Sequence, residues 1–311
     1  YKGINVGNFG VDEFHYLSMG KELLEGHGMG NLFLREGKEW HNPEQKYTPY
    51  LLLPAQWIGL SEKVTIVTLF TFYGFVGVYL LVLLVYFFTL QLSGDRRLSL
   101  ISALFVVLGY NLLTNYLPFY YVNLYSRPLI PLTGVLGLFL YLNLLVKSLR
   151  SSERRYALLA GVAFGLSFYV YFYTWTFISV LSGILFVLYL FVQKEPEQCK
   201  KLCVITGIGF LIGSIELFLL FSFSFTDMGR QILLYGGGSL TRVFTVVKMS
   251  WLALVFFLLY WYWHREEKEW PIMLALILSG IVAINQGVIT GREFQRFHYF
   301  WYFIIPSVTV V

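Results

Sequence analysis

Residues 64–90 read VTIVTLFTFYGFVGVYLLVLLVYFFTL, an apolar run without a charged side chain. A helix of about 20 apolar residues is long enough to cross the hydrocarbon core of a bilayer. Later stretches resemble this run, and we place spans at about 64–90, 98–115, 128–146, 156–172, 176–192, 202–225, 249–263 and 271–289, with a ninth from about 299. The sequence therefore predicts an all-α polytopic membrane protein with about nine spans.

The composition agrees with this class. Of the 311 residues, 57% are hydrophobic and 13% are charged, whereas soluble domains carry about 25% charged residues. The net charge is +5, but the basic residues lie in short loops between apolar runs, so we expect no nucleic-acid partner. Cys199 and Cys203 form a C-x3-C pair without a nearby histidine, which we interpret as two incidental thiols.

Two interfacial helices are expected before the first span. Residues 12–26 place apolar side chains at three- and four-residue spacing between charged ones, which is typical of an amphipathic helix. Tyr47–Leu60 is apolar but too short to span, and Pro49 and Pro54 interrupt it.

The chain accordingly divides into an outer loop at 1–63 and a transmembrane helical domain at 64–311. We expect the sequence to be a fragment, with a further span before Tyr1 and more chain after Val311.

The distribution of Lys and Arg predicts the orientation. One set of alternate loops carries eleven basic residues: Arg96, Arg97, Lys147, Arg150, Arg154, Arg155, Lys194, Lys200, Lys201, Arg265 and Lys268. The opposite short loops carry six: Arg127, Arg230, Arg242, Lys248, Arg292 and Arg296. Because basic loops stay in the cytoplasm, the loop 1–63 is predicted to face outside, together with 114–127, a turn at 173–175, 226–248 and 291–298.

Several of the candidate residues also have an ordinary structural explanation. Asp12 and Glu13 could simply favour the first turn of a helix, and Lys46 and Arg127 could be interfacial residues whose stems lie along apolar surface. Glu216 lies in the middle of a predicted span, where a functional role and a structural hydrogen bond are both open. The polar segment 292–299 (REFQRFHY) is harder to explain by a helix end alone.

Several short motifs follow one another in order: Asp12-Glu13-Phe14-His15-Tyr16, Gly26-His27-Gly28, Glu44-Gln45-Lys46, Ser126-Arg127-Pro128, residues 154–166 (RRYALLAGVAFGL) and His298-Tyr299 with Pro306. This order resembles the GT-C superfamily of integral-membrane glycosyltransferases, in particular the branch with protein O-mannosyltransferases and lipid A aminoarabinose transferases. Tyr173-Thr174-Trp175 stands where that family has Thr-Lys.

The resemblance implies an inverting transfer of a sugar from a polyprenyl-phosphate donor to a lipid, glycan or protein acceptor. It implies that Asp12 is the catalytic base and that Glu13 assists it; a divalent cation on this pair is left open. The expected substrate-binding residues are His15, Tyr16, His41, Glu44, Lys46, Arg127, Trp175, Arg292, Arg296 and His298. The expected location is the plasma membrane, with the site on its extracytoplasmic face.

Two other functions remain open at this point. A transporter is also polytopic, although Glu216 is the clear mid-span charge and no inverted repeat is evident. An oligosaccharyltransferase-like enzyme shares the early Asp motif and transfers a whole glycan to Asn.

Overall fold

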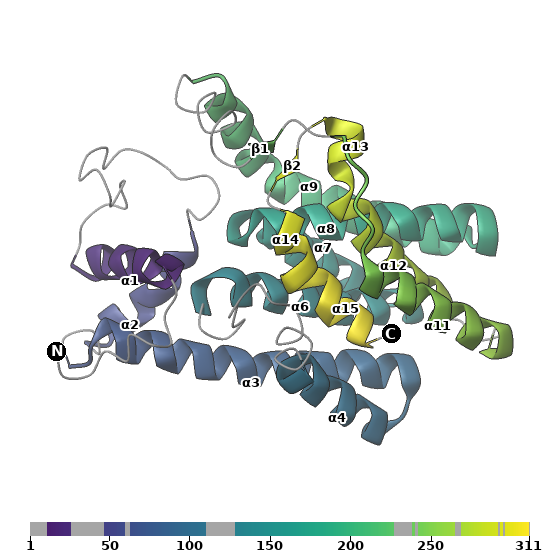
Figure 1. Cartoon of the computed structure of the whole chain (residues 1–311), viewed down its shortest axis with the longest axis horizontal. Coiled ribbons are helices and arrows are strands. Elements are labelled where there is room, and N and C mark those ends of the chain that lie inside the picture. Colours follow the sequence, from purple (N-terminus) through teal and green to yellow (C-terminus); the bar gives the residue numbers. More distant parts are fainter. Residues whose placement is uncertain are drawn as a thin grey trace.

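The described part of the chain is built almost wholly of helices (Figure 1). The computed structural model describes residues 11–25, 47–59, 63–109, 128–226, 238–239, 242–264, 269–291, 293–294 and 296–310. Side chains are described for all of these except 11–15, 49, 109, 128, 238–239, 264, 293–294, 296–297, 301 and 308–309.

The predicted helix at 12–26 is confirmed as α1 (Val11–Leu24). It buries Tyr16, Leu17, Met19 and Leu23, and a Cβ at Gly20 would lie 2.7 Å from Leu52 Cδ1. The second predicted helix, Tyr47–Leu60, is instead two short ones: the 3-10 helix η2 (Thr48–Leu52) and α2 (Leu53–Trp57). Pro49 and Pro54 each stand in the first turn of one of them, where a missing N–H is tolerated.

Four helical stretches of the described residues are long and apolar enough to cross a membrane: Ile66–Ser93, Leu129–Arg150, Phe172–Gln193 and Pro196–Ser224. They comprise α3 (Ile66–Ser93), α6 (Thr133–Arg150) with the end of η4 (Pro128–Leu132), α8 (Phe172–Val187) with η5 (Leu188–Gln193), and α9 (Pro196–Ser224). On α3, Phe72, Phe75 and Tyr79 are exposed, as expected of side chains that face lipid rather than water.

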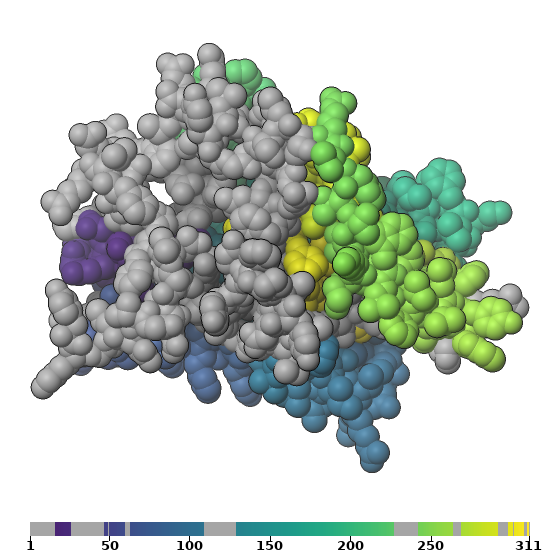
Figure 2. Space-filling view, viewed as in Figure 1, coloured from purple at the N-terminus to yellow at the C-terminus, as the bar shows by residue number. Residues whose placement is uncertain are grey.

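The remaining predicted spans coincide with shorter helices. These are α4 (Arg96–Leu104) with η3 (Phe105–Gly109), α7 (Arg154–Val170), α11 (Lys248–His264), α12 (Trp270–Ile284) with α13 (Gln286–Thr290), and α14 (Arg296–Tyr299) with η6 (Phe300–Ile304) and α15 (Ile305–Val310). In the space-filling view, α11 covers one side of the molecule and α3 with α4 the lower edge (Figure 2). The strands β1 (Gly238–Ser239) and β2 (Glu293–Phe294) pair antiparallel.

Helices α7 and α9 run parallel and pack closely against each other through glycines. Ideal Cβ atoms at Gly161 and Gly165 would lie 2.8 and 2.5 Å from Cβ of Ile208 and Ile212 of α9. In return, Phe164 and Phe168 of α7 fill the space over Gly209 and Gly213. Small residues at four-residue spacing let helix backbones approach closely without a hydrophobic driving force between the helices, which is the packing mode of helices in lipid.

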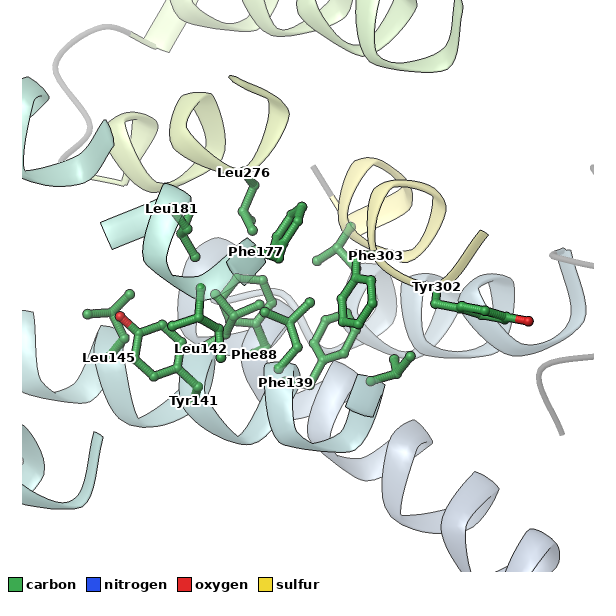
Figure 3. Packing of buried hydrophobic residues seen from close by; sticks show 14 of the residues in the cluster. Phe88, Phe139, Tyr141, Leu142, Leu145, Phe177, Leu181, Leu276, Tyr302 and Phe303 are labelled. Carbon is green, nitrogen blue, oxygen red and sulfur yellow. The ribbon is translucent and has the colours of Figure 1, made fainter. Parts of the chain in front are cut away.

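The chain's last described helices lie inside the bundle rather than at its edge. Phe303 of η6 is fully buried and lies among Phe88 of α3, Phe139 of α6, Phe177 of α8 and Leu276 of α12 (Figure 3). The Phe177 and Phe303 rings stack with centroids 5.6 Å apart. This cluster ties five elements together and orients the residues that precede Phe303, including His298.

Polar contacts hold together the helix ends that the charge count assigns to the cytoplasm. Arg150, at the end of α6, forms an ion pair of 2.5 Å with Glu269, just before α12. Lys201 of α9 donates hydrogen bonds to the carbonyl oxygens of Leu149 and Ser151, at 3.1 and 2.9 Å. The loops around residues 150, 200 and 269 therefore share one end of the bundle, as the alternation of the predicted loops requires.

The prediction of a turn at Tyr173-Thr174-Trp175 is wrong, because these residues belong to the first turn of α8. The break between α7 and α8 is at Tyr171, whose φ of −159° and ψ of 128° are extended. The Tyr171 carbonyl accepts the first hydrogen bond of α8, from Thr174 N–H at 3.0 Å. A single extended residue thus separates two apolar helices, without any Gly, Pro or Asn to mark it in the sequence.

The α7–α9 contact predicts a difference between two Gly→Ala changes on α9. A Cβ at Gly209 would lie 2.1 Å from Phe164 Cδ1, whereas a Cβ at Gly207 meets nothing within 4 Å. Gly209→Ala should therefore lower the thermal stability of the purified protein, by about 1–3 kcal/mol in free energy of unfolding, as overpacking does. Gly207→Ala is the matched control and should leave the melting temperature the same or slightly higher. Equal melting temperatures for both variants would contradict the close contact.

Candidate functional site

The predicted catalytic pair lies at the start of α1. Asp12, Glu13 and His15 belong to its first turns, but their side chains are outside the described set. Tyr16 is described and buried. The end of α1 is fixed to α2, because Gln56 Nε2 donates a hydrogen bond of 3.1 Å to the carbonyl oxygen of Leu24.

Other predicted site residues lie outside the described part of the chain. They are His41, Glu44, Lys46, Arg127 and Arg292, together with the side chain of Arg296. Their predicted roles are not tested by the geometry.

His298 is the best-defined of the predicted residues, and it lies among four tyrosines. Its Nδ1 shares a hydrogen bond with the hydroxyl of Tyr171. The ring of Tyr173 lies 4.8 Å from the imidazole and that of Tyr302 lies 5.5 Å away. Tyr299 contacts Tyr173 edge to face at 4.9 Å. We call Tyr171, Tyr173, His298, Tyr299 and Tyr302 the His298 cluster.

The first turn of α8 positions this cluster. Tyr173 points to His298, while Thr176 Oγ1 forms a hydrogen bond of 2.7 Å with the Tyr299 hydroxyl. On another face of the turn, Thr174 packs onto α6, where a Cβ at Gly134 would lie 2.7 Å from Thr174 Oγ1. Gly134 therefore allows the start of α8, and with it the cluster, to approach α6.

Trp175 lies on the opposite side of the same turn. Its indole stacks on Phe168 with ring centroids 4.6 Å apart and 12° between the planes. Phe168 in turn covers Gly213 of α9, so the α7–α9 contact fixes the indole. The Trp175 Nε1–H is buried and has no hydrogen-bond acceptor among the described residues. The N–H of a buried indole normally has a hydrogen-bond partner. The Trp175 N–H is therefore a candidate donor to a ligand.

The residue after Lys46 connects the outer loop to this region. The ring of Tyr47 packs edge to face on Tyr169 of α7 at 5.3 Å. The Tyr169 hydroxyl donates a hydrogen bond of 2.7 Å to the carbonyl oxygen of Ile212 on α9. Glu216 lies one turn further along α9 and is 1% exposed. The end of the outer loop and the buried carboxyl of Glu216 are therefore both close to the α7–α8 break.

A second connection joins the loop before α11 to the end of α12. The Asn285 side-chain oxygen accepts a hydrogen bond from Thr245 N–H at 2.6 Å, and its nitrogen donates to the Thr245 carbonyl at 3.0 Å. Arg242 extends over Gly291, whose φ of +73° favours glycine: Arg242 Nε and Nη2 each lie 3.6 Å from the place of a Cβ. Arg242 thus lies against Gly291, at the end assigned to the outer face.

Three residues of this region were not among the predicted site residues, although Tyr299 belongs to the His298-Tyr299 motif. Tyr171 and Tyr299 resemble ordinary aromatic residues of a membrane interface, and Asn285 lies within the predicted span 271–289. For Asn285 a signal was available, since a buried amide in an apolar helix needs hydrogen-bond partners. For Tyr171 no local signal separates it from the other tyrosines of the chain.

The question of a bound cation is not decided by this geometry. Among the described side chains, no three His, Cys, Asp or Glu residues lie close enough to hold a metal ion. The carboxylates of Asp12 and Glu13 are not part of that set.

No protein-family model, no curated protein and no solved structure matches the chain.

The His298 cluster predicts the effect of removing one hydroxyl. Tyr171→Phe keeps the ring but removes the hydrogen bond to His298 Nδ1, so the free energy of unfolding should fall by about 1 kcal/mol. Thermal unfolding in detergent, followed by near-UV circular dichroism, measures the change. Tyr79→Phe is the control, because Tyr79 is exposed on α3, and it should unfold like the parent. An unchanged melting temperature for Tyr171→Phe would mean that this hydrogen bond contributes nothing to stability.

Proposed function

We propose that this chain is an integral-membrane glycosyltransferase that moves a sugar from a polyprenyl-phosphate donor to an acceptor at the extracytoplasmic face. The single observation that supports it most is the meeting of distant segments at one end of the bundle. Tyr47 reaches Tyr169, and Tyr171 reaches His298. The end of the outer loop, the α7–α8 break and the start of the last helix thus come together around aromatic and hydrogen-bonding groups.

The proposed chemistry needs a base near the acceptor. Asp12 removes the proton of the acceptor hydroxyl as its oxygen attacks the anomeric carbon. The bond between that carbon and the phosphate oxygen breaks, and polyprenyl phosphate leaves with the electron pair. The configuration at the anomeric carbon is inverted because attack and departure occur on opposite faces. A positioned general base of this kind contributes about 10²–10⁴ in rate. Glu13 orients the acceptor or holds a cation.

The leaving phosphate carries growing negative charge, which cations stabilise. Lys46, Arg127, Arg292 and Arg296 are the proposed phosphate-binding residues, and Arg242, which lies against Gly291, adds a further positive charge at this end. Lys46 directly precedes Tyr47, whose ring packs against α7.

The sugar is proposed to lie against the aromatic groups. His15, Tyr16, His41 and Glu44 from the outer loop, with Trp175 and His298 from the bundle, are the proposed sugar-binding residues. Support comes from Trp175, whose buried N–H lacks an acceptor among the described residues, since a sugar hydroxyl is a suitable acceptor. His298 is only partly buried and is oriented by Tyr171 and Tyr173.

The transfer itself is tested with membranes that contain the overexpressed chain. Polyprenyl-phosphate sugars, each radiolabelled in the sugar, are added one at a time, and the label is followed out of the organic phase. Transfer of one label to a lipid, glycan or protein acceptor supports the proposal. Label that stays on its lipid but crosses the membrane would favour the transporter alternative.

The proposed orientation makes a prediction about labelling from outside. Cys199 is buried, so the reporters are single cysteines at exposed positions in a Cys199→Ser, Cys203→Ser background. One reporter is Lys63→Cys, at a position just before α3 at the proposed outer end. The other is Lys200→Cys, near the start of α9 at the proposed cytoplasmic end. A membrane-impermeant maleimide should label Lys63→Cys in intact cells and Lys200→Cys only in inside-out vesicles. The reverse pattern would place Asp12 on the cytoplasmic side and overturn the proposal.

The proposed base makes the most direct prediction for activity. Asp12→Asn keeps the shape of the side chain but removes the basic oxygen, so turnover should fall at least about a hundredfold. Binding of the donor lipid and thermal stability should stay close to those of the parent. Glu25→Gln on the same helix is the control: Glu25 forms a surface ion pair with Lys21 at 3.7 Å, and its loss should change turnover less than about twofold. Turnover of Asp12→Asn within a few-fold of the parent would reduce Asp12 to an acid at a helix start.

A further inference from the structure

Two cations each lie close to the ring of Tyr156, at the end of the bundle opposite the His298 cluster. Lys147, in the last turn of α6, places its Nζ 6.0 Å from the ring centroid of Tyr156. Arg155, in the first turn of α7, places its Cζ 5.0 Å from the same centroid. The Arg155 Nη2 also donates a hydrogen bond of 3.3 Å to the Tyr156 hydroxyl. The proton of that hydroxyl remains available for a further acceptor.

The local charges leave a positive excess at this place. Arg155 pairs with Glu153, whose Oε2 lies 2.6 Å from Nε and raises the pKa of the guanidinium. Lys147 is exposed, and no described carboxylate lies within ion-pair distance of it. Three other cations of this end are engaged: Arg150 with Glu269, Lys200 with Glu197, and Lys201 with two carbonyl oxygens.

Exposed leucines lie beyond each of the two cations along its helix. On α6, Leu140 is 44% exposed and lies seven residues before Lys147, about 10 Å along the same face. On α7, Leu158, Leu159 and Leu166 are 53%, 46% and 54% exposed and follow Arg155 at three, four and eleven residues. The residues between these positions are mostly buried, so the exposed leucines form a narrow stripe on α7 and a single apolar position on α6.

We propose that Lys147, Arg155 and Tyr156 bind the headgroup phosphate of an anionic phospholipid, whose acyl chains lie along the exposed leucines of α7 and Leu140 of α6. The phosphate is held between the ammonium of Lys147 and the guanidinium of Arg155, and the Tyr156 hydroxyl donates to one of its oxygens. An anion shared by both cations offsets their mutual repulsion. The general preference of basic residues for the cytoplasmic side explains why cations are present here, but not why two of them converge on one ring.

The occupant is a membrane lipid because the charged group is followed along α7 by exposed leucines, three and four residues after Arg155. A soluble phosphate would make no contact with the exposed leucines. A phospholipid contacts both the cations, through its phosphate, and the leucines, through its acyl chains. Anionic lipids are enriched in the cytoplasmic leaflet of many membranes, and clustered Lys and Arg near a span attract them. The inference rests on the helices crossing a bilayer, and it does not depend on the proposed transferase activity.

The test is lipid retention measured by native mass spectrometry. The full chain is reconstituted in vesicles of equal parts phosphatidylglycerol and phosphatidylcholine with identical acyl chains, then extracted into mild detergent. The parent should retain phosphatidylglycerol in preference to phosphatidylcholine. A cation at the membrane surface is worth about fivefold in affinity for anionic lipid, so Lys147→Gln with Arg155→Gln should lower the retained phosphatidylglycerol at least about tenfold.

The matched control removes the same charge from the same end of the bundle. Arg96→Gln with Arg97→Gln lies at the exposed start of α4 and should retain phosphatidylglycerol like the parent. Equal loss in both double variants would mean diffuse surface charge and overturn the site. Equal retention of both lipids by the parent would overturn it as well. If the double variant unfolds, the single change Lys147→Gln at an exposed position decides between these outcomes, with an expected loss of about fivefold.

Discussion

Two parallel helices, α7 and α9, approach each other at four glycines, and much of the described structure depends on this contact. Each helix supplies two glycines and receives two large side chains from the other. In lipid, where apolar side chains gain little by leaving their surroundings, such close packing is a main source of helix association. Because Phe168 is held over Gly213, it offers a fixed surface on which Trp175 stacks. The contact between helices thus determines the position of a candidate ligand-binding group.

The extended residue Tyr171 links this helix packing to the His298 cluster. It lies between the end of α7 and the start of α8, and its hydroxyl shares a hydrogen bond with His298. Because only one residue separates α7 from α8, the two helices remain in contact, and their aromatic residues lie around this break. The two ends of the bundle consequently differ in chemistry. At one end the helices are held together by an ion pair and by hydrogen bonds from Lys201 to carbonyl oxygens. At the other end the contacts are made by tyrosines, an imidazole and an amide.

Much of the fold could be predicted from the sequence because its physical signals are local. Apolar runs mark the helices, and the amphipathic spacing of residues 12–26 marks α1. The α7–α8 break could not be predicted at Tyr171, because a tyrosine within an apolar segment gives no sequence signal that its backbone is extended. The short helices after residue 47 differ from the predicted single one because two prolines each start a new helix.

The candidate site was only partly predictable. His298 and Trp175 were identified from the sequence, and both lie at the α7–α8 break or next to it. Their partners, Tyr171 and Phe168, depend on which helices pack together, and sequence spacing along one helix contains no such information. Asp12 and Glu13 are placed on α1 by their backbone alone, so their role as a catalytic pair remains a prediction.

The amide of Asn285 binds both the N–H and the carbonyl of Thr245, as a neighbouring strand would. These two bonds recognise the main chain, and every residue except proline presents the same pair of groups. In a family of such proteins, position 245 would therefore be free to vary as far as this contact is concerned, while position 285 would stay an amide. The loop before α11 could then acquire new side chains over evolutionary time without losing its anchor on α12.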